Sequence, residues 1–278
     1  MLFKYNIDEI YNEYLKEERK NKNKKKNEIN NRVYVCWDLH WAETYSWDSE
    51  KLSPKKWKES KVLNKNDILI ILWDFGFFFT RPHSQESREK IAKLLKDVPT
   101  TIAFVPGNHE NYDFIFGLPT EIKWWGEVFV YEHPDTKEKI YALKRGEVYN
   151  IEWHKILAIW GALSIDKAAR EEDKTWWALE YLTEEEKKRT VENIRKHKWI
   201  FDYILSHTPP IWTYYFFLEN WYYDNPKLRD EVAIFLQHIY DKYKLQFKVW
   251  YAGHLHIDKC ILDWKFCCLY NHPPIRLK

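Results

Sequence analysis

Five short segments of the chain carry side chains that bind metal ions or transfer protons. They contain aspartate, histidine, asparagine and glutamate, in the order Asp38-Leu39-His40, Trp73-Asp74, Gly107-Asn108-His109-Glu110, Ser206-His207 and Gly253-His254-Leu255-His256. Carboxylate, imidazole and amide groups together suit Mn, Fe or Zn better than Ca or Mg. One such segment is a weak signal, because a single histidine after a strand is more often a hydrogen-bonded structural residue. All five in sequence indicate a hydrolase with two metal ions.

Each of these segments follows an apolar run rich in β-branched and aromatic residues, which is typical of a buried strand. The runs cover residues 33–36, 68–72, 101–105, 203–205 and 247–251. Sites in α/β proteins lie outside the carboxyl ends of the strands. We therefore expect the five segments to converge at one edge of a sheet.

With these segments the chain resembles the calcineurin-like metallophosphoesterase family, whose usual pattern is D-x-H, G-D-x-x-D, G-N-H-E or G-N-H-D, a separate H, and G-H-x-H. The resemblance covers roughly residues 32–271, and residues 107–113 and 161–167 are most similar to the small bacterial and phage-type branch. It implies an α/β fold, a four-layer α/β/β/α sandwich of two mixed sheets flanked by helices. The periodicity of the sequence alone supports only a mixed α/β fold.

The resemblance also implies a role for each candidate ligand. Asp74 would bridge two divalent cations, because close cations need a shared anion between them. The remaining ligands would divide between the cations, with Asp38, His40 and His256 at the first, and Asn108, His207 and His254 at the second. A hydroxide bridging the metals would attack phosphorus in line. His109 would protonate the leaving oxygen, oriented by Glu110 or a neighbouring carboxylate.

The substrate is expected to be a phosphoester, held by cationic side chains. Arg170 and Lys167 are candidates to clamp its phosphate, although a solvated, charged helix start over residues 166–173 explains them equally well. Arg145 is a weaker candidate of the same kind. A phosphomonoester, a phosphodiester and a nucleotide all remain open. Protein serine/threonine phosphatases are disfavoured, because they carry arginines beside the second and third motifs. A metal-binding scaffold of the same fold without turnover is the alternative from another functional class.

Two departures from the family pattern stand out. The second aspartate of G-D-x-x-D is missing, because Asp74 is followed by Phe75, Gly76 and Phe77. Tryptophan also precedes Asp38 and Asp74, where the pattern has glycine. The 278 residues include 16 Trp and only 7 Gly, whereas ordinary usage of about 7% Gly would give roughly 20. We therefore hypothesise that UGA codons, read here as Trp, encode Gly in the source organism at Trp37, Trp41, Trp73, Trp125, Trp153, Trp160 and Trp264. A lineage that uses tryptophan heavily is the alternative.

The length suits one large α/β domain rather than two. We expect a phosphoesterase domain over residues 32–278, preceded by an N-terminal helix and basic tether over residues 1–31. Residues 5–18 have the apolar spacing of an amphipathic helix. The lysine-rich run over residues 16–26 could bind nucleic acid or anionic lipid, but a solvated tether is the more common meaning of such a run.

No apolar stretch suits a signal peptide or a transmembrane span, so we expect a cytoplasmic protein with no membrane contact. The four cysteines show no disulfide-framework spacing, which predicts buried thiols in a reducing compartment.

Helix and turn signals mark the remaining elements. Ser84, with Ser87 as the alternative, is expected to cap a helix ending near residue 97. Thr183 and Glu186 form a capping-box pattern for a helix reaching about Lys196. The other expected elements are a short helix or loop over residues 53–61, antiparallel strands over residues 128–164, a helix over residues 226–243 opened by Asn225-Pro226, and a hairpin over residues 259–269.

Overall fold

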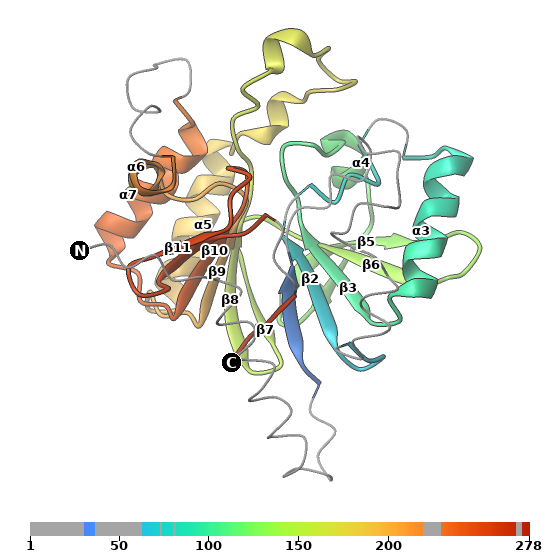
Figure 1. The fold of residues 1–278 in the computed structure, drawn as a ribbon, viewed down its shortest axis with the longest axis horizontal. Coiled ribbons are helices and arrows are strands. Elements are labelled where there is room, and N and C mark those ends of the chain that lie inside the picture. Colours follow the sequence, from blue (N-terminus) through green and yellow to red (C-terminus); the bar gives the residue numbers. More distant parts are fainter. Residues whose placement is uncertain (1–30, 37–62, 73, 80–81, 219–228, 271–273) are drawn as a thin grey trace.

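The computed structural model describes residues 31–36, 63–72, 74–79, 82–218, 229–270 and 274–278. In these residues, two mixed β-sheets pack face to face, and helices cover their outer sides (Figure 1). This arrangement confirms the four-layer α/β/β/α sandwich. The expected N-terminal helix, the basic run and the element over residues 53–61 lie outside the described residues.

The first sheet carries the strands that precede the first three motifs. Its order is β13-β1-β2-β3-β6-β5-β4, in which β1, β2, β3 and β6 run parallel and the remaining neighbours pair antiparallel. The strand bounds are β1 (Val33–Cys36), β2 (Ile68–Leu72), β3 (Thr101–Val105), β4 (Thr120–Lys123), β5 (Gly126–Glu132), β6 (Lys139–Leu143) and β13 (Ile275–Arg276). The apolar runs before the motifs therefore form the central strands, as predicted.

The second sheet carries the strands that precede the last two motifs. Its order is β11-β12-β10-β9-β8-β7, with β12, β10, β9 and β8 parallel and the two edge pairs antiparallel. The strand bounds are β7 (Glu147–Ile151), β8 (His154–Ile159), β9 (Tyr203–Ser206), β10 (Val249–Ala252), β11 (Lys259–Ile261) and β12 (Phe266–Cys268). In both sheets, the motif residues therefore follow the carboxyl ends of parallel strands.

Helices flank both sheets. Helix α3 (Gln85–Asp97) lies beside the first sheet with the short α4 (Tyr112–Phe116), while α5 (Glu184–Lys196), α6 (Tyr214–Phe217) and α7 (Glu231–Tyr243) lie beside the second (Figure 1). One apolar core extends from the space between the sheets to helices α3 and α4 beside the first sheet, and another lies between the second sheet and its helices. Burial on both faces explains why the central strands are almost uniformly apolar.

The caps of two helices confirm the sequence signals, and the start of a third corrects one. The Ser84 side chain accepts the N–H of Ser87, so Ser84 is the cap of α3. Thr183 and Glu186 form the complete capping box of α5. Helix α7 begins later than expected, because the Asp230 carboxylate accepts the first free N–H groups of the helix.

The stretch over residues 128–164 is more complex than the expected antiparallel strands. β5 and β6 pair in the first sheet, whereas β7 and β8 pair in the second. The chain therefore crosses between sheets within this stretch. Strand β4, which alternates exposed and half-buried residues, was not predicted. The expected hairpin near the C-terminus is present as β11 and β12.

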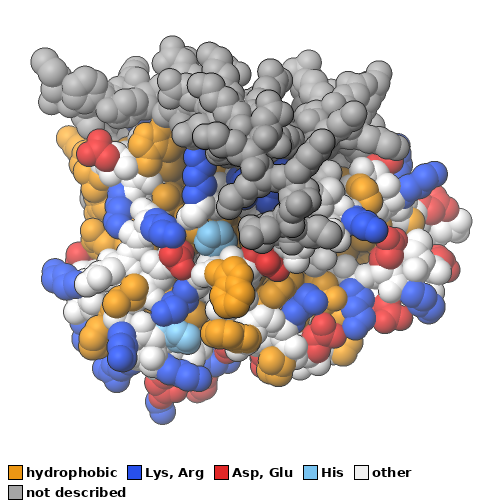
Figure 2. Space-filling model, turned by 90° about the horizontal axis from the view of Figure 1, so that it is seen from below, with side chains coloured by type: hydrophobic (Ala, Val, Ile, Leu, Met, Phe, Trp, Pro, Cys, Tyr) orange, Lys and Arg blue, Asp and Glu red, His pale blue; other side chains and the backbone are white. Residues whose placement is uncertain are grey.

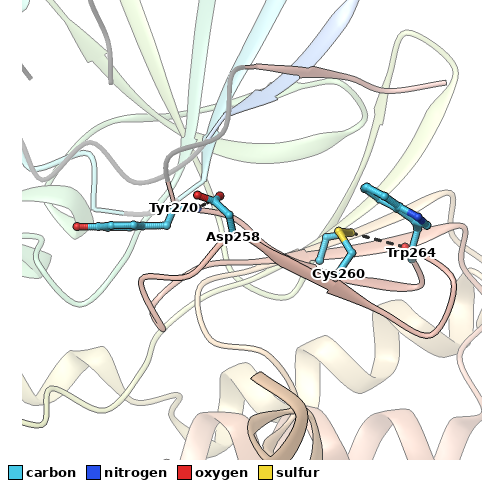
Figure 3. Close-up of a disulfide and its surroundings, with 5 residues drawn as sticks. Asp258, Cys260, Trp264 and Tyr270 are labelled. Atoms are coloured by element: carbon cyan, nitrogen blue, oxygen red, sulfur yellow. Dashed lines mark hydrogen bonds between the residues drawn. A yellow bond between two sulfur atoms is a disulfide. The ribbon is translucent and has the colours of Figure 1, made fainter. Parts of the chain in front are cut away.

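The expectation of four unpaired cysteine thiols is wrong for one pair. Cys260 and Cys267 lie opposite each other on the antiparallel strands β11 and β12, with their α-carbons 4.1 Å apart, and form a disulfide (Figure 3). Such cross-strand proximity depends on register, which the cysteine spacing alone does not give. Cys36 and Cys268 are buried thiols, as expected, and burial raises the pKa of both.

The face of the molecule seen in Figure 2 carries side chains of both charges. On the face in Figure 2, Lys and Arg side chains are interspersed with Asp and Glu, and hydrophobic side chains stand among them. None of the helices in the described ranges has the length and apolar character that crossing a bilayer requires.

Candidate metal centre

Four predicted ligands come together where the two sheets meet. Asp74 and Asn108 follow β2 and β3 of the first sheet, while His207 and His254 follow β9 and β10 of the second. Asn108 Oδ1 lies 2.6 Å from His207 Nε2, and that nitrogen lies 3.9 Å from Asp74 Oδ2. The rings of His207 and His254 are 4.8 Å apart. The sequence prediction that separate motifs converge is met for these four residues.

The backbone is strained at three predicted ligands. Asp74, His254 and His256 have φ values of 41°, 60° and 52°. Residues with side chains take this left-handed conformation uncommonly, and such residues are found in turns and are enriched at functional sites. Asp74 and His254 both lie next to His207, with Asp74 Oδ2 3.9 Å from His207 Nε2 and the two imidazole rings 4.8 Å apart.

Asp74 is fixed by the segment that carries the third motif. The backbone N–H of His109 donates to Asp74 Oδ1 at 2.8 Å. The α-carbon of Gly107 packs against the same carboxylate, so a side chain at Gly107 would collide with it. The loop after Asp74 is held as well, because the buried Glu110 carboxylate accepts the N–H of Gly76 at 3.2 Å.

Asn108 is held by a buried pair that the sequence analysis did not identify. Its Nδ2 donates to Ser164 Oγ at 3.0 Å, and Ser164 Oγ donates to Glu180 Oε2 at 2.6 Å. Glu180 Oε1 also accepts the backbone N–H of Ser164 at 3.1 Å. Burial raises the pKa of Glu180, while the hydrogen bonds from Ser164 oppose that shift.

His109 and Arg170 are in contact beside the candidate metal ligands. Arg170 Nη2 lies 3.0 Å from His109 Nε2 and 2.8 Å from the Asp166 carboxylate. The ring of Phe79 packs against His109 with a centroid distance of 5.5 Å. Lys167 lies elsewhere, with Nζ 3.2 Å from the hydroxyl of Tyr181. The structure therefore brings Arg170, but not Lys167, into contact with the candidate acid.

The other three predicted ligands are not seen among the converging side chains. Asp38 and His40 lie outside the described residues. His256 is exposed, and its ring stacks on Tyr270 with a centroid distance of 4.6 Å. Asp258 accepts the backbone N–H of Tyr270 at 2.8 Å, which ties these two segments together (Figure 3).

The chemistry of the donor set decides whether these residues can hold a metal ion. Among the described residues, no three His, Cys, Asp or Glu side chains are arranged closely enough to hold a metal by themselves. Asn108 adds an amide oxygen to the convergent group, and this oxygen lies 2.6 Å from His207 Nε2. One carboxylate, one amide oxygen and two imidazoles suit Mn, Fe or Zn. These residues fit a divalent cation.

Two features of the sequence acquire structural explanations. Phe75 and Phe77 occupy the region of the missing aspartate, and Phe75 stacks on Phe104 in the core at 4.6 Å. Arg145, a weaker candidate for phosphate binding, is buried instead and pairs with Glu186 at 2.6 Å. Arg145 is thus a structural residue, because the carboxylate and neighbouring carbonyls take up its donors.

Sequence reasoning overlooked Ser164, Glu180 and the packing role of Gly107. Ser164 lies in the 161–167 segment that resembles the phage-type branch, so that motif was the available signal. Glu180 had no such signal, because it reaches the site only through the tertiary fold.

Comparison with known proteins identifies a family and several distant structures. The sequence pattern described as calcineurin-like phosphoesterase matches residues 31–258. No curated protein matches the chain. Solved structures that match include a protein of unknown function from Aquifex aeolicus, with 15% identity over 89% of this chain and 96% of that one, at a TM-score of 0.40.

Two further solved structures carry names. Phosphopantetheinyl hydrolase from Mycobacterium tuberculosis is 14% identical over 87% of this chain and 88% of that one, with a TM-score of 0.43. A putative 5′-nucleotidase from Staphylococcus aureus, in complex with alpha-ketoglutarate, is 11% identical over 86% of this chain and 48% of that one, with a TM-score of 0.44. Likenesses this distant decide nothing about the substrate.

Proposed function

The chain belongs to the calcineurin-like phosphoesterase family, and we propose that it hydrolyses a phosphoester with the help of two divalent cations. The observation that carries this proposal is the convergence of Asp74, Asn108, His207 and His254 from two sheets. We assign catalysis to residues 32–278 and a tethering role to residues 1–31.

We further propose how these residues would hold the cations. Asp74 would contact both, Asn108, His207 and His254 would hold one, and Asp38, His40 and His256 the other. The donor set favours Mn, Fe or Zn. Bound metals supply a nucleophilic hydroxide at neutral pH and neutralise charge on the phosphate. The contacts of His207 with Asn108, Asp74 and His254 support this assignment.

His109 is the proposed general acid. Its backbone N–H donates to Asp74 Oδ1, which places the residue next to the candidate centre. There it can donate a proton to the leaving oxygen of the substrate. Arg170 contacts the same imidazole. A phosphate oxygen would compete for the Arg170 guanidinium, which would bind the substrate and free the His109 nitrogen for proton transfer.

The test combines metal analysis with two generic substrates. The purified protein is analysed for bound metal, and hydrolysis of para-nitrophenyl phosphate and bis(para-nitrophenyl) phosphate is measured with added Mn²⁺. We expect turnover of at least one substrate and its loss after chelation. Asp74→Asn should abolish turnover while leaving the circular dichroism spectrum unchanged. His238→Asn, on the exposed face of α7, is the matched control and should retain full activity.

The same experiment distinguishes a phosphoesterase from a metal-binding scaffold without turnover. A folded protein that binds metal but hydrolyses neither substrate would contradict the proposal and support a non-catalytic metal-binding scaffold. Preference for one of the two substrates would decide between phosphomonoesterase and phosphodiesterase activity.

A further inference from the structure

The Asn108 side chain has two chemically different ends, and only one can hold a cation. The amide oxygen is a metal ligand, whereas the amide nitrogen carries two hydrogens and is not. In the structure, Nδ2 points to Ser164 and Oδ1 points to His207. The orientation of this amide therefore decides whether the centre has its oxygen ligand.

The Ser164 hydroxyl determines that orientation through its hydrogen bond to Glu180. A hydroxyl has one hydrogen, and here it is donated to Glu180 Oε2 at 2.6 Å. The lone pairs of Ser164 Oγ remain, and they can only accept. The group of Asn108 that faces Ser164 must therefore be its NH₂, which turns the oxygen toward His207.

The position of Glu180 is itself restricted by buried neighbours. Glu180 ends a 3₁₀ turn over Ala178–Glu180 and is fully buried. Its backbone carbonyl accepts from Arg145 Nη1 at 3.4 Å and lies against the α-carbon of Gly161, where φ is +113°. These contacts fix the backbone of the turn that carries the Glu180 carboxylate.

We propose that Ser164 and Glu180 are positioning residues that orient the Asn108 amide so that its oxygen faces the cation site. This proposal rests on the proposed function, because it assumes that Asn108 holds a cation. Removal of a side chain that orients a ligand typically costs 10- to 100-fold in metal affinity. Ser164 and Glu180 would act through Asn108 and would not touch the substrate.

The experiment measures Mn²⁺ binding to the chelated protein by isothermal titration calorimetry, independently of activity. We expect Ser164→Ala and Glu180→Gln to weaken Mn²⁺ binding about 10- to 100-fold. Glu180→Gln should act because its amide can donate to Ser164 and let the hydroxyl turn. Thr190→Ala removes a buried hydroxyl that donates to the Glu186 carbonyl on α5. As the matched control, it should leave Mn²⁺ affinity unchanged.

A change at Asn108 itself distinguishes orientation from general structural support. The two oxygens of a carboxylate are equivalent, so Asn108→Asp needs no orienting partner. In that background we expect Ser164→Ala to have little further effect on Mn²⁺ affinity. An equal loss in both backgrounds, or no loss in the wild-type background, would overturn the positioning role. If the wild-type chain itself binds no Mn²⁺, the proposed function fails instead.

A separate set of residues shows unusual backbone conformations far from these ligands in the sequence. Five described tryptophans have positive φ, namely Trp124 at 52°, Trp125 at 70°, Trp153 at 70°, Trp199 at 60° and Trp264 at 69°. The side chains of Trp125 and Trp153 are 79% and 87% exposed. At these two sites the unfavourable conformation is not offset by burial of the indole.

Trp125 and Trp153 occupy the same position in two separate hairpins. Residues 124–125 join β4 to β5, and residues 152–153 join β7 to β8, each as a two-residue loop with positive φ at both positions. This is the type I′ turn, in which glycine is strongly preferred at the second position. Trp199 and Trp264 also follow residues with positive φ.

The backbone conformation supports glycine at some of the tryptophan positions hypothesised to be UGA-encoded, but not at all of them. Trp125, Trp153 and Trp264 adopt the left-handed conformation, whereas Trp160 does not. Trp160 is buried, donates to the Leu143 carbonyl at 2.7 Å and stacks against Arg145. The hypothesised positions Trp37, Trp41 and Trp73 lie outside the described residues.

We infer that the native protein carries glycine at Trp125, Trp153, Trp199 and Trp264, encoded by UGA. Reading the four codons and sequencing the corresponding peptides from the native organism by mass spectrometry tests this. We expect UGA codons and glycine-containing peptides. Trp177 and Trp250, which are buried with bonded indole N–H groups, are the internal control and should be UGG. UGG codons or tryptophan-containing peptides at the four positions would overturn the inference.

Discussion

Oδ1 of Asp74 lies against the α-carbon of Gly107, in the space that a Cβ atom at Gly107 would need. The smallest change at Gly107 therefore acts on the carboxylate that we propose to contact both cations. The contact is tight because His109, two residues later, holds the same oxygen through its backbone N–H.

Gly107→Ala should displace the Asp74 carboxylate, weaken Mn²⁺ binding and lower turnover about 100-fold, since a misplacement of about 1 Å costs a reaction that much in rate. Calorimetry and the para-nitrophenyl assays measure the two effects. Gly117→Ala is the matched control, since its added methyl would meet only the Asp113 and Phe114 carbonyls, with 3.2 Å as the closest approach. Full activity of Gly107→Ala would contradict a close functional contact.

His109→Asn should lower kcat about 10²- to 10⁴-fold, because proton donation to the leaving oxygen is lost. Alkyl phosphoesters should suffer more than aryl phosphoesters, because poor leaving groups depend more on protonation. The kcat for an alkyl and an aryl substrate is compared in both proteins. An equal loss for both would indicate that His109 has another role.

Arg170→Ala should lower kcat/KM by roughly 10- to 100-fold, which corresponds to the loss of about 1.5–3 kcal/mol from a charged hydrogen bond. Arg170→Lys should restore little, because an ammonium cannot reproduce the guanidinium fork. Lys167→Ala is the informative comparison, since Lys167 lies against Tyr181 rather than His109. A larger effect at Lys167 than at Arg170 would reverse the assignment of the phosphate clamp.

Arg145→Met should destabilise the fold by about 3–5 kcal/mol, because it leaves the Glu186 carboxylate without its buried partner. Urea unfolding measures the free-energy change. Arg195→Met removes an exposed arginine from α5 and should change stability by less than about 0.5 kcal/mol. Equal stability of the two variants would show that the buried pair contributes little.

Trp153→Gly should raise the free energy of unfolding by about 1 kcal/mol, since it relieves a left-handed residue whose side chain is exposed. Trp177→Gly should have the opposite effect, because it removes a buried indole that donates to Asp113 at 3.0 Å. Thermal and urea unfolding of both variants test these signs. Destabilisation by Trp153→Gly would argue that the tryptophan contributes to the hairpin.

The sequence predicted the central strands and the order of the motifs well. Buried parallel strands are nearly continuous apolar runs, and the segments 68–72 and 101–105 show this plainly. The convergence of Asp74 with Asn108 follows from their places at neighbouring strand ends. These features depend on local pattern, which the sequence contains directly.

Other features depend on tertiary neighbours and could not be predicted. The link from Glu180 to Asn108 spans distant segments joined only by the fold. The disulfide between Cys260 and Cys267 required the register of β11 and β12. The sequence predicted too early a start for α7, because Asn225-Pro226 is a typical helix-start pattern. In the folded chain Asp230 caps the helix instead.

Because each sheet contributes two members of the convergent group, neither half of the sandwich can assemble the centre alone. A cation bound there would cross-brace the two halves, and relative sliding of the sheets would separate Asp74 and Asn108 from His207 and His254. Any ligand that binds only the folded chain stabilises it by mass action. Metal binding should therefore stabilise both halves of the sandwich together, and the melting temperature of the protein should depend on the concentration of free metal.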